Sequence, residues 1–203
     1  MSKRRLENSN NSQSVNIYGF SGLNNEYYNE LNCDSIKIIN NRIIFHSSIT
    51  NFTIEKLFEF IKIIIESPTF DRNFNRIYLH IISIGGTLDA LNDFINIKKN
   101  HYTSIEFVSV IENTCSDAGF MLAALCNYRI IKKNVICYMS PINNNNKYWG
   151  IYLQDQNLLN NLSNVILNCK LKISTIKFNK YLIQNNIWNA KKMLKIGLMD
   201  EII

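Results

Sequence analysis

A double glycine at the end of an apolar run is the first feature of this sequence that could do chemistry. The run Ile77–Ile82 predicts a strand, and Gly85 and Gly86 follow it just before a helical pattern that starts near Thr87. Glycines at a strand-to-helix turn leave backbone N–H groups accessible, and such groups can stabilise a negatively charged oxygen. Because most glycine pairs mark only turns, this pair gains its weight from a second segment further along the chain.

The second segment joins a buried strand to a helix through a polar turn. Residues Ile105–Ile111 predict the strand, and a helix rich in Ala and Leu follows the turn. The turn carries Cys115, Ser116 and Asp117, of which we expect the cysteine to be a packing residue. A serine hydroxyl attacks an amide only when a neighbouring base removes its proton. The chemistry of Ser116 therefore depends on a base from elsewhere in the chain.

Histidine is the usual base for such a serine, and the sequence has three, His46, His80 and His101, all of which precede Ser116. We expect His46 and His80 to be hydrogen-bonded structural residues of strands, and His101 to lie solvated in a polar loop. Their spacing does not match that of metal ligands, and no Cys-x-x-Cys pair accompanies them. We therefore expect neither a metal site nor a cofactor.

Together the two segments resemble the proteolytic subunit of Clp protease, within the superfamily that also includes the crotonases. Ser83-Ile-Gly-Gly86 is similar to the family's Ser-Pro-Gly-Gly, with Ile84 in place of proline, and Arg42–Phe45 resembles its first core strand. Trp188–Ile202 resembles its closing helix and Gly-Leu-x-Asp-Glu-Ile ending. The resemblance covers residues 40–203. It implies an α/β fold of repeated βαβ units with a C-terminal helical handle region.

The resemblance also places the family's catalytic positions on this chain. The nucleophile position falls on Asp117, the histidine position on Ser140 and the aspartate position on Asn185, in a turn over residues 184–188. Gly85, Gly86 and Ala118 fall on the oxyanion hole. All three triad positions are changed.

The altered triad implies a proteolytically inactive ring subunit with a structural or regulatory role. Such a subunit would form a homo- or hetero-oligomeric ring with Clp-type subunits and contact an AAA+ unfoldase. The compartment implied is the cytoplasm or an organelle stroma such as that of a plastid.

Two alternatives stay open. The chain could be an active serine endopeptidase that cleaves unfolded polypeptides, with Ser116 as nucleophile and a base that the sequence does not reveal. It could also be a crotonase-like acyl-CoA enzyme, since Gly119–Ile130 resembles a crotonase run. In that run, however, Met121 stands in place of the glutamate that does acid–base work in many crotonases.

Composition limits the remaining classes. A chain of 203 residues with 46% hydrophobic content can bury one core, which predicts one domain over 36–203. Residues 1–35 are rich in Asn and Ser, and we expect a mobile polar extension. The net charge of +6 comes with lysines spread along the chain, so we expect no nucleic-acid partner. No apolar run reaches the roughly 20 residues of a membrane span, and five scattered cysteines favour reduced thiols.

The elements that position these residues follow from periodicity and capping signals. Strands alternating with helices predict a mainly parallel sheet. Five helices are expected. The first is capped by Thr53 and ends at Ser67, and the second places Leu88, Leu91 and Phe94 on the sheet. The third covers 158–166, the fourth contains Ile173, Ile176 and Phe178, and the last lies between Asn189 and Gly197. Further strands are expected over Arg129–Ile131 and Val135–Met139.

Overall fold

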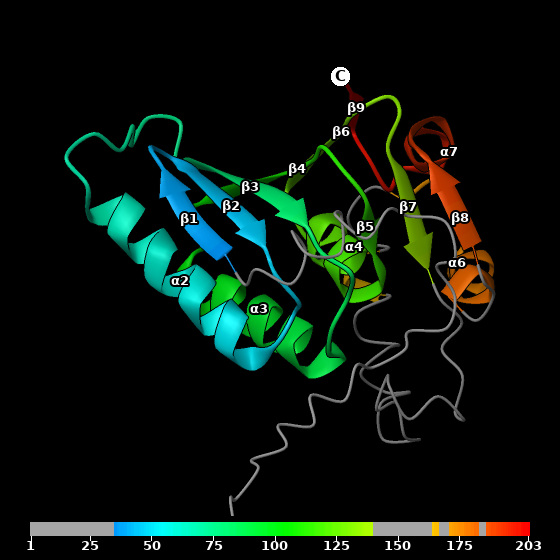
Figure 1. Ribbon diagram of the computed structural model, residues 1–203, viewed down its shortest axis with the longest axis horizontal. Helices are drawn as coiled ribbons and strands as arrows, with labels where there is room; N and C mark the ends of the chain where they lie inside the picture. The colour runs from blue at the N-terminus through cyan, green and yellow to red at the C-terminus, as the bar shows by residue number, and fades with distance from the viewer. Residues whose placement is uncertain (1–34, 140–163, 167–170, 183–185) are drawn as a thin grey trace, which may run out of the picture.

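The computed structural model describes residues 35–139, 164–166, 171–182 and 186–203 (Figure 1). Its strands are β1 (Ser35–Ile39), β2 (Arg42–His46), β3 (Arg76–Ile82), β4 (Glu106–Ile111), β5 (Cys115–Ser116), β6 (Tyr128–Ile131), β7 (Ile136–Met139), β8 (Asn186–Asn189) and β9 (Glu201–Ile202). Its helices are α2 (Asn51–Glu66), α3 (Leu88–His101), α4 (Asp117–Ala124), α6 (Thr175–Leu182) and α7 (Ala190–Ile196).

The strands form two sheets. The larger has the order β1-β2-β3-β4-β6-β9, and every neighbouring pair in it is parallel except β1 and β2. The smaller has the order β5-β7-β8, with β5 and β7 parallel and β8 antiparallel to β7. The prediction of an α/β fold with a mainly parallel sheet is confirmed.

The two faces of the larger sheet differ in burial. Along β3, Ile77, Leu79 and Ile81 are fully buried in the core, on the side where α2 and α3 lie against the sheet (Figure 1). The residues that alternate with them are only half-buried. We call this second side the open face; its members on β2, β3 and β4 include Ile44, His46, Tyr78, His80, Ile82 and Val110.

Helix ends follow local hydrogen bonding. The N-cap of α2 is Thr50 and not Thr53: the Thr50 hydroxyl accepts from the Thr53 N–H at 3.2 Å, and the Thr53 hydroxyl accepts from the Thr50 N–H at 2.9 Å. The predicted end at Ser67 is confirmed. The last helix also begins and ends as predicted, because the Asn189 side chain accepts from the Lys192 N–H at 2.8 Å and Gly197 takes a φ of 83°.

The sequence missed strand β1, which pairs with β2 through a two-residue turn at Asn40, whose φ of 56° suits asparagine. Three local predictions are wrong. Cys115 and Ser116, expected in a polar turn, form strand β5. The expected turn over 184–188 includes part of β8, where Trp188 lies opposite Cys137. His101 is the last residue of α3 and not a loop residue, although it is exposed as expected.

A buried ion pair fastens the end of the chain to the larger sheet. The Arg129 side chain on β6 is 1% exposed, and its guanidinium donates to Asp200 through Nε at 2.8 Å and Nη2 at 3.1 Å. The Arg129 backbone N–H also donates a hydrogen bond to that carboxylate, and the Asp200 backbone N–H donates one to the Arg129 carbonyl. The paired charges fix the segment that leads into β9.

Within the described ranges, none of the helices is long and apolar enough to cross a bilayer.

We expect Asp200→Asn to lower the free energy of unfolding by about 3–5 kcal/mol, because it leaves the Arg129 charge buried and uncompensated. Urea denaturation followed by circular dichroism measures the loss. Glu66→Gln is the control, since Glu66 pairs with Lys62 at 3.9 Å with both side chains more than half exposed, and its loss should stay below about 0.5 kcal/mol. Equal losses in the two variants would contradict this account of Arg129.

Candidate functional site

The double-glycine turn after β3 has a backbone that only glycine adopts easily. Gly85 has a φ of 123° and Gly86 a φ of 149°. The turn is held against the segment before α2, because the Ile49 N–H donates to the Gly85 carbonyl at 2.7 Å and the Thr87 N–H donates to the Ile49 carbonyl at 2.8 Å. A Cβ on Gly86 would overlap the Ile49 carbonyl. The sequence placed this turn correctly between strand and helix.

The second segment docks directly on the end of β3. The Ser116 N–H donates to the Ser83 carbonyl at 2.8 Å, and Cys115 forms a parallel bridge with Ser83. In the first turns of α4, Gly119 lies so close to Ser83 that any Cβ there would overlap the serine side chain. The start of α4 therefore lies against Ser83, two residues before the double glycine.

Asp117 occupies the corner between β5 and α4. Its φ is 49°, in the left-handed region, and it is 7% exposed. Among the described residues only Asn40 and Asn75 share a positive φ without being glycine, and neither of them is buried. A strained backbone of this kind costs about 1–3 kcal/mol and is found most often at functional sites. The corner residue is thus a buried aspartate in a left-handed conformation.

Ser116 lies beside Tyr138 across the smaller sheet. The two residues are register partners on β5 and β7, so their side chains share one face of that sheet. Ser116 is 4% exposed and Tyr138 is half-buried. Sequence reasoning missed Tyr138, because only the pairing of β5 with β7 reveals that a phenol stands next to this hydroxyl.

The cysteines near the site are packing residues, as expected. Cys115 and Cys137 are free, fully buried register partners on the opposite face of the smaller sheet. Burial raises the pKa of the Cys115 thiol well above its usual range, and burial raises the pKa of Cys137 to about 12. Neither thiol is therefore available as a thiolate near neutral pH.

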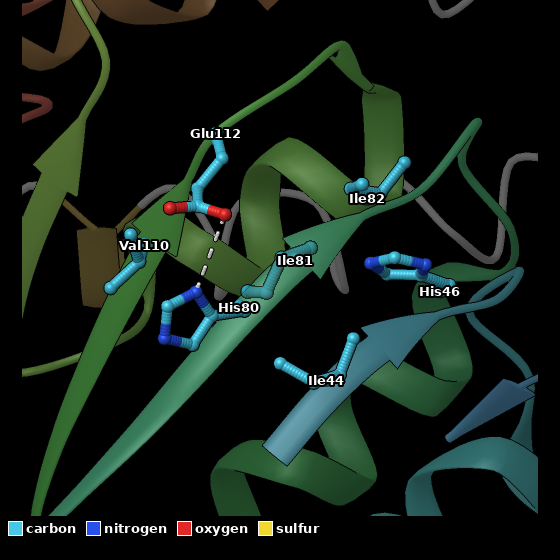
Figure 2. A pocket seen from close by; sticks show the side chains of 7 residues that line it. All are labelled: Ile44, His46, His80, Ile81, Ile82, Val110 and Glu112. Atoms are coloured by element: carbon cyan, nitrogen blue, oxygen red, sulfur yellow. Dashed lines mark ion pairs between the residues drawn. The ribbon is translucent and has the colours of Figure 1, made fainter. Parts of the chain in front are cut away.

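Two of the histidines lie on the open face, where His46 and His80 line a cavity of about 220 Å³ (Figure 2). Ser116 is not among the residues that line this cavity. The Nδ1 of His80 is 3.8 Å from Glu112 Oε2, and Lys132 Nζ is 3.3 Å from the other oxygen of that carboxylate. Burial lowers the pKa of His80, although Glu112 acts in the opposite direction.

The two remaining predicted triad positions, Ser140 and Asn185, lie outside the described residues. Within the residues that the structure describes, no group of three or more His, Cys, Asp or Glu side chains could hold a metal ion.

No protein-family model and no curated protein matches the sequence. Among solved structures, the chain is similar to the catalytic domain of the ClpP protease from Plasmodium falciparum, with a TM-score of 0.61 and 16% sequence identity. The similarity covers 77% of this chain and 80% of that one. The chain has the fold of a ClpP protease catalytic domain. The predicted fold class is confirmed, and the ClpP-like fold explains why β3, β5 and α4 meet at one place.

Gly119→Ala is expected to destabilise the protein by about 1–3 kcal/mol, because the added methyl group overlaps Ser83 where α4 docks on β3. Thermal or urea unfolding measures the effect. Adding Ser83→Gly to the same chain removes the clashing atoms and should recover part of the loss. A double variant no more stable than Gly119→Ala would show that the contact with Ser83 is not the cause.

Acidification is expected to destabilise the fold through His80. The pKa of His80 is lower in the folded protein than its ordinary value of about 6.5. As the pH falls through that value, the unfolded chain therefore binds the proton more readily than the folded protein does. The free energy of unfolding should therefore fall as the pH drops from about 7.5 to 5.5, and less so in His80→Gln. His101→Gln, at an exposed position, should keep the wild-type pH dependence. An unchanged slope in His80→Gln would contradict this assignment.

Proposed function

We propose that this protein is a subunit of a Clp-type protease ring that does not cleave peptide bonds through a Ser-His-Asp triad. The observation that carries the proposal is Asp117, a buried carboxylate at the strand-to-helix corner of a ClpP-like fold. The resemblance in sequence assigns the nucleophilic serine to that position.

The chemistry of the corner supports this proposal. A carboxylate is a poor nucleophile towards an amide, and its negative charge opposes the charge that develops on the carbonyl oxygen during attack. The N–H groups proposed as the oxyanion hole, on Gly85, Gly86 and Ala118, belong to the two segments that meet at Ser83. The Gly85 N–H itself donates to the Ser83 hydroxyl at 3.3 Å. In the proposal these residues shape a vestigial pocket, which Ser116 and Asp117 line.

A ring subunit without a triad would have a structural or regulatory role. We propose that it assembles with itself or with active Clp-type subunits, and that the ring contacts an AAA+ unfoldase. The compartment proposed is the cytoplasm or an organelle stroma, and the buried thiols of Cys115, Cys126 and Cys137, none of which is in a disulfide, suit such a reducing environment.

One observation favours a second candidate, an active serine endopeptidase. Tyr138 stands beside Ser116 in the smaller sheet and is a group that could take its proton. This candidate requires both side chains, which separates it from the first.

The test is reaction of the purified full-length protein with a fluorophosphonate serine probe, after separation by size. We expect a particle of ring size that remains unlabelled at pH 7 and at pH 9. Ser116→Ala and Tyr138→Phe are the matched variants, the second of which keeps the ring and removes only the hydroxyl. Labelling that is lost in both variants would overturn the inactive assignment, and a monomer of this protein would overturn the ring.

A further inference from the structure

Three large apolar side chains are exposed on two surfaces that face away from each other. Phe52 and Ile63 on α2 are 70% and 55% exposed, and Ile39 on β1 is 53% exposed. The buried residues of α2 pack into the core on one side of the larger sheet, so Phe52 and Ile63 point away from that sheet (Figure 1). Ile39 is the register partner of Arg42 and lies with the open face, on the other side. The two surfaces therefore cannot meet within one chain.

The outward surface of α2 combines these apolar residues with unpaired acidic ones. We call it the helix ridge, and it comprises Phe52, Glu55, Glu59 and Ile63. Spacings of three and four residues align the four side chains along one side of the helix, opposite the residues that it buries. Both glutamates are exposed, and no ion pair within the described part of the chain involves them.

The nearby lysines of α2 lie beside this ridge. Lys62 pairs with Glu66 at 3.9 Å, and Lys56 Nζ lies 5.9 Å from the centre of the Phe60 ring. The ridge itself therefore presents two carboxylates between two apolar side chains.

The first two strands of the open face carry the opposite charge. We call this surface the strand patch, and it comprises Lys37, Ile39, Arg42 and Ile44. Lys37 is the register partner of Ile44 and Ile39 that of Arg42, so the four side chains share one side of the sheet. Both cations are exposed, and neither belongs to an ion pair among the described residues.

The helix ridge and the strand patch complement each other in charge and in spacing. Side chains four residues apart on a helix are about 5–6 Å apart at Cβ, and diagonal neighbours on paired strands, such as Lys37 and Arg42, are about 7–8 Å apart. Within one copy each surface holds two like charges side by side, which is unfavourable. Between two copies each glutamate can meet a cation, while the apolar side chains cover one another.

We infer that the helix ridge of one copy docks on the strand patch of a second copy of this chain. A second copy is the occupant because both halves of the match are present on the same chain. The two surfaces differ and point in opposite directions, so the contact is head-to-tail, and its repetition adds copies until a ring closes. The inference rests on the proposed ring and names the surfaces that join its neighbours.

Charge reversal in the full-length chain tests the contact. We expect Glu55→Lys with Glu59→Lys, and separately Lys37→Glu with Arg42→Glu, to raise the dissociation constant between copies by about a hundredfold or more, because like charges then face each other. Analytical ultracentrifugation over a concentration series measures it. All four changes in one chain restore the complementarity and should return the particle to its wild-type size.

Lys191→Glu with Lys195→Glu is the matched control, because it reverses two exposed charges on α7 and should leave the size unchanged. Circular dichroism checks that each variant is folded. The wild-type protein gives a second measurement that needs no variant. A carbodiimide, which joins a carboxylate to an amine in contact with it, should link Lys37 to Glu55 or Glu59 in the cross-linked dimer.

Each other outcome overturns the inference. A wild-type ring whose size neither charge reversal alters, or whose cross-linked dimer lacks these links, would leave the proposed ring standing and remove only this contact. Dissociation of both double variants without recovery in the fourfold variant would mean that the two surfaces do not face each other. A wild-type monomer would overturn the proposed ring itself, and the contact with it.

Discussion

The structure around the site depends on one packing contact, the docking of the start of α4 on the end of β3. Gly119 touches Ser83 without a Cβ between them, and the Ser116 N–H is bonded to the Ser83 carbonyl. This close approach brings two segments that are separated in sequence to one place. It sets Asp117 at the corner and places the double-glycine turn beside it, so the arrangement of the site follows from two residues that do no chemistry themselves.

Because this contact fixes the backbone, the chemistry possible at the site depends on the side chain at the corner. The backbone supplies a left-handed corner at Asp117 and a double-glycine turn, on which the proposed nucleophile position and oxyanion hole rest. Under the proposed function, Asp117 replaces the nucleophile at that corner without altering the scaffold. A protein can therefore keep a ClpP-like fold while losing the chemistry that such a corner supports in a serine hydrolase.

The open face differs from the core side of the larger sheet because it combines aliphatic and ionisable side chains. Strands β2 and β3 alternate between a buried side and a more exposed side. His80 and Glu112 line the aliphatic hollow on that second side, and Lys132 pairs with Glu112. Partial burial keeps the imidazole from charging easily, so the hollow is less polar near neutral pH than its composition suggests.

The sequence alone determined the fold class, most strands, the double-glycine turn and the last helix from Asn189 to Gly197, because periodicity, caps and glycine placement are local signals. It did not reveal β1, β5 or β8, which exist through pairing with β2 and β7. It placed the first helix cap at Thr53, whereas reciprocal hydrogen bonding puts the cap at Thr50. Only the tertiary structure placed Tyr138 beside Ser116 and fixed the strained backbone of Asp117. Neighbours across a sheet and the dihedral angles of a corner depend on strand register, and register is set by long-range packing that no local pattern encodes.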